Sequence, residues 1–282
     1  MRTNPRHLRG TRGGRAARGP AAALTALLAG CAALPQHFDS PARRACGIVY
    51  ILPGIEGRSV LNHDIAHGLH DGGVPFAIRI YDWTTPLPGG LLFNLSDLER
   101  NRAQAAELAG RIVRYREDHP GAPVHLIGHS GGGGIAVLAV EALPAGRQID
   151  RLVLLAPALG YRYDLTTALR RTRIGLHCFW SEHDVGILKV GTTLFGAIDR
   201  TPGVAAGAAG FEPPPDLSPA GLELYDARLH NIRWTPRLAP LGADGSHFGW
   251  AARRFARRVL APLVMYDGAG DVLPHAAAAP AR

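Results

Sequence analysis

The stretch APVHLIGHSGGGGIAVLAV, residues 122–140, decides the fold of this chain. It begins with a short apolar run typical of a buried strand, passes through Gly128-His129-Ser130-Gly131-Gly132, and continues as an apolar helix over 133–143. A Gly-x-Ser-x-Gly sequence between a strand and a helix is typical of a strained turn that exposes the serine. Glycine is needed two positions before and after the serine, because a larger side chain would collide with the adjacent backbone. We therefore expect the Ser130 hydroxyl at a tight bend, beside the free N–H groups of a helix N-terminus.

Apolar runs and amphipathic helical patterns alternate on both sides of this stretch. The expected strands cover residues 47–52, 74–83, 123–127, 151–156, 174–180 and 231–234. The expected helices cover residues 59–69, 97–118, 133–143 and 248–260. This alternation predicts an α/β domain over 46–265, with a mostly parallel central sheet flanked by helices on both faces. Between 186 and 227 the pattern dissolves into Gly, Ala and Pro, which predicts a loop or lid, and 266–282 reads as a disordered tail.

Composition supports a globular domain and argues against a nucleic-acid partner. The 282 residues are 46% hydrophobic and 19% charged, enough to bury a full core. The formal net charge is +8, but six arginines and no acidic residue lie in the first 30 positions. Without them, 25 basic residues face 23 acidic ones, so the rest of the chain carries only +2. That charge is too small to indicate binding to a phosphate backbone.

The first 30 residues read as a signal peptide. An arginine-rich start is followed by the apolar run 21–29, which is too short to span a bilayer. The run ends in Leu28-Ala29-Gly30-Cys31, which resembles the lipobox of bacterial lipoproteins. The resemblance implies a lipidated Cys31, a linker over 31–45 and a membrane lipoprotein of the bacterial envelope; Ala32, instead of an aspartate, points to the outer membrane. The alternative is an ordinary signal peptide cleaved at a nearby Ala-x-Ala site.

With its strand, Gly-x-Ser-x-Gly turn and helix in direct succession, the chain resembles the α/β-hydrolase superfamily from about Gly47 to Leu260. The resemblance implies an eight-stranded, mostly parallel sheet, and a catalytic triad in the chain order serine, acid, histidine. It also implies a serine hydrolase without a cofactor or a metal, which cleaves carboxylic esters of small molecules or lipids through an acyl-enzyme on Ser130. The alternative is a catalytically silent surface lipoprotein that keeps the fold as a binding module.

The same resemblance implies the partners of the serine. The acid follows the strand ending at Trp180, in Ser-Glu-His-Asp at 181–184, where Asp184 is favoured. Glu182 and, after the preceding strand, Asp164 remain open as alternatives. The histidine is His247, in the turn-rich loop before the last helix, with His230 as the less favoured candidate.

The oxyanion donors are expected to be two backbone N–H groups, from Gly131 and Ile55. Ile55 lies in Pro53-Gly54-Ile55, directly after the first strand. The superfamily often has a histidine before the glycine of this loop, whereas this chain has Pro53 there.

Several other residues invite a functional interpretation that we do not favour. His63, His67 and His70 have a spacing that can bind zinc, but we expect a solvated helix face and no metal site. Glu56 and Arg58 could contact a polar substrate, and we favour a local ion pair between them. His129 is expected to pack without a catalytic role. Cys46 and Cys178 are expected to be unpaired, because their strands are not neighbours.

Overall fold

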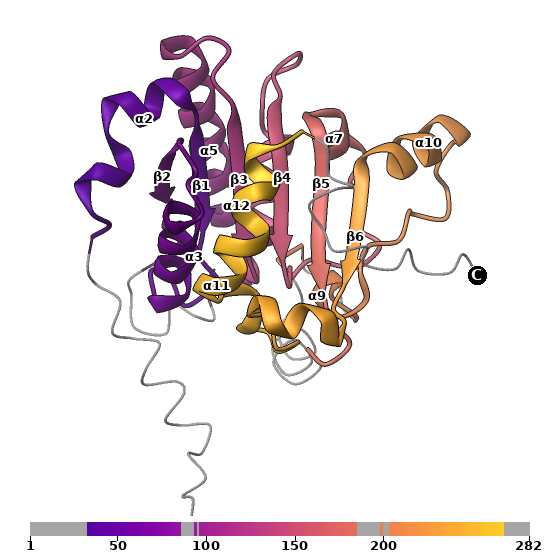
Figure 1. Cartoon of the computed structure of the whole chain (residues 1–282). Coiled ribbons are helices and arrows are strands. Elements are labelled where there is room, and N and C mark those ends of the chain that lie inside the picture. The colour runs from indigo at the N-terminus through magenta and orange to yellow at the C-terminus, as the bar shows by residue number, and fades with distance from the viewer. Residues whose placement is uncertain (1–32, 86–92, 95, 185–197, 200–202, 268–282) are drawn as a thin grey trace, which may run out of the picture.

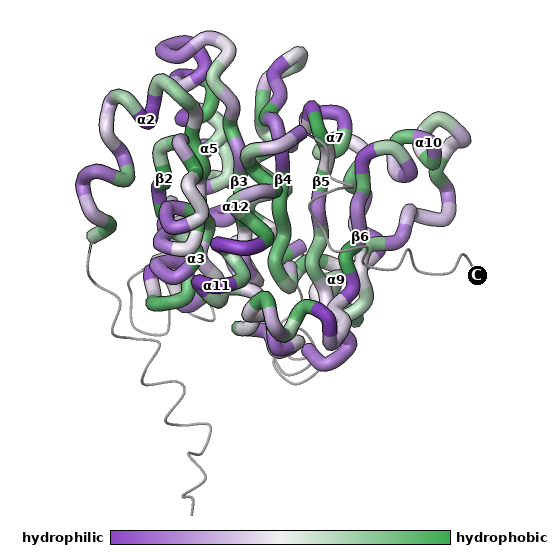
Figure 2. Tube along the Cα trace, in the orientation of Figure 1, coloured by the Kyte–Doolittle hydropathy of each residue, from purple (hydrophilic) through white to green (hydrophobic). Residues whose placement is uncertain are grey.

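Six parallel strands form the centre of the molecule, in the order β2-β1-β3-β4-β5-β6 (Figure 1). The computed structural model describes residues 33–85, 93–94, 96–184, 198–199 and 203–267. The strands are β1 Ile48–Leu52, β2 Ala77–Ile80, β3 Val124–His129, β4 Ile149–Leu155, β5 Thr172–Trp180 and β6 Leu229–Arg233. Every residue of β1, β3 and β4 is buried, as parallel strands covered on both faces require. Figure 2 shows this as a run of hydrophobic residues along the lower half of β4.

Helices cover both faces of the sheet. Those of the first half are η1 Gln36–Asp39, α2 Pro41–Cys46, α3 Val60–Asp71, α5 Leu98–Asp118, α6 Gly131–Glu141 and α7 Thr166–Arg170. Those of the second half are α9 Ala206–Ala209, α10 Pro219–Arg228, η2 Pro236–Leu241, η3 Gly249–Ala251, α11 Arg253–Phe255, η4 Ala256–Leu260 and α12 Ala261–Met265. One core lies between the sheet and α5 and α6, and the other between the sheet and α3, α11 and α12, which are in front of the strands in Figure 1. The α/β architecture expected from the alternation is confirmed.

Two expectations differ from the structure. The described part of the sheet has six strands and not the eight that the resemblance implies. The helix expected over 248–260 is broken into η3, α11 and the π-helix η4, and it then continues as α12 to Met265. A π-helical turn interrupts the regular ladder, and Pro262 has no N–H with which to continue it.

The segment expected as a linker, 31–45, is folded from Gln36 onward. Phe38 is buried against His67 and His70 of α3, with ring centroids 5.1 and 4.6 Å apart. These two histidines therefore pack against an aromatic ring, which corrects the expected solvated face. Ser40 caps α2 and Pro41 occupies its first turn, a helix-start signal that the sequence carries.

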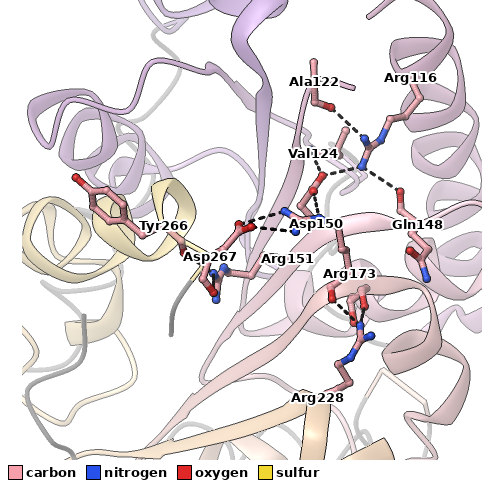
Figure 3. Close-up of polar contacts among 11 residues, drawn as sticks. Arg116, Ala122, Val124, Gln148, Asp150, Arg151, Arg173, Arg228, Tyr266 and Asp267 are labelled. Atoms are coloured by element: carbon pink, nitrogen blue, oxygen red, sulfur yellow. Dashed lines mark hydrogen bonds and ion pairs between the residues drawn. The ribbon is translucent and has the colours of Figure 1, made fainter. Parts of the chain in front are cut away.

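The buried carboxylate of Asp150 links neighbouring strands at their N-terminal ends, and Ser130 follows the C-terminal end of β3. Figure 3 shows the bonds of this carboxylate. Asp150 of β4 accepts hydrogen bonds from the Val124 amide at 2.8 Å, from Arg116 of α5 at 2.6 Å and from Arg173 of β5 at 2.8 Å. Burial alone would raise the pKa of Asp150, but these donors together hold the pKa below its ordinary value. One carboxylate thus crosslinks three strands and a helix.

The residues after α12, expected in a disordered tail, also bond to the sheet. Arg151 of β4 is fully buried and donates to the carbonyl of Tyr266 at 2.7 Å. Arg173 forms an ion pair with Asp267 at 3.0 Å (Figure 3). Tyr266 and Asp267 therefore belong to the folded domain.

The predicted signal peptide, Cys31, most of the expected lid and the end of the predicted tail lie outside the described residues. Within the described part of the chain, none of the helices combines the length and the apolar character needed to span a membrane. Cys46 and Cys178 are both free, as expected, the first exposed and the second buried in β5.

Candidate active site

Ser130 lies between β3 and α6 in a backbone conformation that L-residues rarely adopt. Its φ of 53° and ψ of −122° form a sharp strand-to-helix turn. Ser130 and Ala156 are the two non-glycine residues with positive φ in the described part of the chain. Such strain persists only where the surrounding structure enforces it, and it places the Ser130 side chain at the N-terminus of α6.

The glycines on either side of Ser130 let this turn form. A Cβ at Gly128 would lie 2.5 Å from the Gly132 carbonyl oxygen, and a Cβ at Gly132 would lie 2.3 Å from the Pro53 carbonyl oxygen. Both distances are shorter than a van der Waals contact, and the atoms met belong to the main chain, which cannot move aside easily. Any side chain larger than that of glycine at position 128 or 132 would therefore collide with the main chain, as expected from the Gly-x-Ser-x-Gly sequence.

His247 is bound to Asp184 at the same edge of the sheet. His247 Nδ1 lies 2.8 Å from Asp184 Oδ2, and the side chains are 4% and 1% exposed. Burial raises the pKa of Asp184, and the hydrogen bond from His247 opposes that rise. A carboxylate only accepts, so Nδ1 carries the proton and Nε2 keeps a free lone pair.

The alternative acid and histidine candidates lie elsewhere. Glu182 is exposed and paired with Arg233. Asp164 is exposed and accepts the Thr166 amide. His230 stacks on His177 with ring centroids 4.5 Å apart. The structure brings Asp184, and not these residues, to His247.

The Ser130 hydroxyl makes no hydrogen bond to any residue that the structure describes, His247 included. The two residues are linked indirectly, because His129, next to Ser130 in the chain, contacts the main chain of His247 at 3.0 Å. Contacts between a nucleophile and its base are often long without substrate and shorten when it binds.

The loop after β1 faces the N-terminus of α6. The Ile55 Cγ2 atom would be 2.8 Å from a Cβ at Gly131. Within the described residues, neither the Ile55 nor the Gly131 N–H donates to a backbone carbonyl. The side chain of Ile55 therefore packs on Gly131, the residue after Ser130, and both N–H groups are free of backbone acceptors among the described residues.

Two residues that the sequence analysis missed hold this loop in place. Trp83 Nε1 donates to the Pro53 carbonyl at 2.8 Å, and the Asn94 amide donates to the Ile55 carbonyl at 2.9 Å. Both side chains are buried. Trp83 ends an apolar run and could have been suspected, whereas nothing distinguishes Asn94 from other polar residues of a Gly- and Pro-rich loop.

Glu56 does not pair with Arg58, which corrects the expected local ion pair. Its carboxylate folds back over Gly54, where a Cβ would lie 2.2 Å from Oε2, and the Ser59 hydroxyl donates to it at 3.4 Å. Burial raises the pKa of Glu56, and the positive charge of a protonated His247 opposes the rise. The Glu56 carboxyl is therefore held within the loop after β1, away from Arg58.

We expect Glu56→Gln to increase the free energy of unfolding at pH 8 but not near pH 4. A carboxyl whose folded pKa lies above its unfolded value of about 4.3 costs stability once it ionises, and the cost is complete above the folded pKa. Below the unfolded pKa both states hold the proton, so the difference vanishes. Urea denaturation of the wild type and the variant across this pH range measures it.

Glu182→Gln is the matched control, because Glu182 is an exposed carboxylate in an ion pair. Its removal should cost less than about 1 kcal/mol and should bring no gain at pH 8. Equal stability of Glu56→Gln and wild type at pH 8 would contradict the burial of an ionisable Glu56.

Comparison with known proteins gives a family and a fold. The model of the family Hydrolase_4, described as serine aminopeptidase S33, matches residues 44–185. Lipase B of Aspergillus fumigatus aligns over 90% of this chain and 59% of its own, with 13% identity and a TM-score of 0.51, so this chain spans less than two thirds of the lipase. The poly(3-hydroxybutyrate) depolymerase LpqC of Bordetella parapertussis aligns over 80% of each chain, with 15% identity and a TM-score of 0.43. No curated protein matches. The fold is the α/β-hydrolase fold expected from the sequence.

Proposed function

Since the chain belongs to the Hydrolase_4 family, described as serine aminopeptidase S33, and is a hydrolase, we propose that it cleaves carboxylic esters through an acyl-enzyme on Ser130. One observation carries the proposal: a serine in a strained turn lies next in the chain to His129, which contacts His247, and His247 is bound to the buried Asp184. The nucleophile, base and acid roles in this proposal fall on Ser130, His247 and Asp184.

In the proposed reaction, His247 Nε2 takes the proton of the Ser130 hydroxyl as Oγ attacks the acyl carbonyl. The imidazolium that results is stabilised by Asp184 and then gives its proton to the leaving alcohol. Water, deprotonated by the same nitrogen, attacks the acyl-enzyme, and the proton returns to Ser130 Oγ as the carboxylic acid leaves. The N–H groups of Gly131 and Ile55 bind the negative oxygen of both tetrahedral intermediates.

Apolar side chains beside Ser130 favour a hydrophobic acyl group. Three apolar side chains pack on Gly131: the nearest atoms of Ile55, Trp83 and Ile198 would lie 2.8, 3.3 and 3.6 Å from a Cβ at that position. Trp83 and Ile198 are fully buried. The surroundings of the serine turn are therefore apolar, which supports small-molecule and lipid esters with an apolar acyl chain as substrates.

A fluorophosphonate probe and a series of p-nitrophenyl esters test the proposal. We expect one probe per chain, attached to Ser130, and hydrolysis of the esters at rates that depend on acyl length. A folded protein that neither reacts with the probe nor hydrolyses any ester would instead support the binding module.

We also propose that Cys31 carries lipid and holds the domain on the bacterial envelope. The lipobox-like sequence supports it, and so does the short distance to the folded body, because Phe38 is already buried seven positions later. Seven extended residues span at most about 25 Å, so the anchor would keep the domain next to the membrane.

Expression in a diderm bacterium tests this anchor. We expect the wild type in the membrane fraction, with acyl chains on Cys31 by mass spectrometry, and Cys31→Ser in the soluble fraction or unprocessed. Cleavage at another site, with no acyl mass on Cys31, would show an ordinary signal peptide.

A further inference from the structure

His129 is the last residue of β3 and directly precedes Ser130. Its side chain is buried, with 2% of its surface exposed. Its Nε2 lies 3.0 Å from the main-chain carbonyl oxygen of His247, which is 118 positions further along the chain. This contact gives His129, for which only packing was expected, a partner in the candidate site.

The chemistry of the contact fixes its direction. A carbonyl oxygen can only accept a hydrogen bond. His129 Nε2 must therefore carry a hydrogen and donate the hydrogen bond to the His247 carbonyl. Burial, together with the positive charge that a protonated His247 would carry, lowers the pKa of His129 to about 3. The ring is therefore neutral at ordinary pH, and its single N–H is committed to the His247 carbonyl.

His247 is thereby held at two points. Asp184 binds the imidazole at Nδ1 and His129 binds the main chain, while the two histidine rings lie 5.0 Å apart. Earlier in the loop, Trp234 donates to the Ala243 carbonyl at 2.8 Å, and Asp244 accepts from the amide and hydroxyl of Ser246. The bond from His129 ties this loop to the strand that carries Ser130.

We propose that His129 is a positioning residue that fixes the main chain of His247 relative to Ser130. The inference rests on the proposed function, because it assigns His247 the role of base. A neutral donor suits the place: the side chain of His247 contacts the Asp184 carboxyl and the rings of His129 and Phe248, and a cation there would oppose the imidazolium that forms during turnover.

Two substitutions separate hydrogen bonding from packing. His129→Phe keeps an aromatic ring of similar size and removes the donor. His129→Gln fills the space less well, but its Nε2 can take the place of the histidine Nε2 and donate. His125→Phe is the matched control, because His125 lies on the same face of β3, is equally buried, stacks on Phe76 and has no hydrogen-bond partner among the described residues.

The readouts are kcat and KM for a p-nitrophenyl ester, the rate of fluorophosphonate labelling and the thermal unfolding midpoint. We expect His129→Phe to lower kcat and the labelling rate by about 10- to 100-fold with KM within about 2-fold, because small displacements of a base cost rate and not binding. His129→Gln should retain most of the wild-type rate, within about 5-fold, and His125→Phe should match wild type.

The order of the two His129 variants decides the question. If His129→Phe is as active as wild type, or more active than His129→Gln at similar unfolding midpoints, then the residue only packs and the inference is wrong. Should His129→Phe fail to fold, a His129→Gln variant slower than wild type by more than 100-fold would overturn it, and one within 5-fold would support it. A wild type that does not label at all would refute the proposed function instead.

Discussion

Ser130→Ala is expected to lower kcat for ester hydrolysis by about 10⁶-fold and to abolish labelling by a fluorophosphonate. The methyl side chain cannot form the acyl-enzyme, and the residual rate comes from the oxyanion donors and substrate binding alone. The measurement is a p-nitrophenyl ester assay with a purified variant and long incubation, together with the labelling stoichiometry.

The same variant should fold like the wild type. Alanine keeps the Cβ that makes a φ of 53° costly, so the strain of the turn is unchanged. Ser130→Gly is the informative control, because it also lacks the nucleophile and relieves the strain, which should raise the free energy of unfolding by about 1 kcal/mol. Activity within 10-fold of wild type in either variant would exclude Ser130 as the nucleophile.

The second large effect is expected from Asp184→Asn, at about 10⁴-fold in kcat. The carboxylate holds the proton of His247 on Nδ1 and leaves Nε2 free to act as base. An asparagine amide that donates to Nδ1 would favour the other tautomer, with the proton on Nε2, and the ring could then no longer accept the serine proton. Stopped-flow or long-incubation ester assays cover this range.

Glu182→Gln and Asp164→Asn are the matched controls for the acid, since both carboxylates were candidates on the sequence. Glu182 pairs with Arg233 and Asp164 caps a local turn, and neither contacts His247. Each variant should keep kcat within about 2-fold of wild type. A large loss in one of them, together with an active Asp184→Asn, would move the acid to that residue.

The strands and the serine turn could be predicted because buried parallel strands leave a simple pattern. Each of β1, β3 and β4 is a short run of apolar residues bounded by turn residues, and the steric need for Gly128 and Gly132 is local. The positions of Asp184 and His247 were implied by the resemblance to the α/β-hydrolase superfamily and not by a local pattern. The pairing of His247 with Asp184 in the structure agrees with them.

Contacts between distant residues could not be predicted. Asp150, Arg116 and Arg173 look like ordinary surface charges until the sheet forms and buries the carboxylate among them. Glu56 was assigned to Arg58 because the two are close in sequence, but the Arg58 amide bonds to Asp82 and the Glu56 carboxyl turns toward Gly54. The role of Asn94 likewise depends on a partner 39 positions away.

The buried Arg151 makes Tyr266, which follows the last described helix, part of the unit that folds together. Its guanidinium, on a central strand, depends on the carbonyl of Tyr266, one residue beyond the last helix. Shortening the gene to Met265 would keep every described helix and strand but would remove two carbonyl acceptors of this buried cation and leave it His177, at a cost of about 1–3 kcal/mol. A purification tag or a protease site is therefore better placed after Asp267 than at the end of α12.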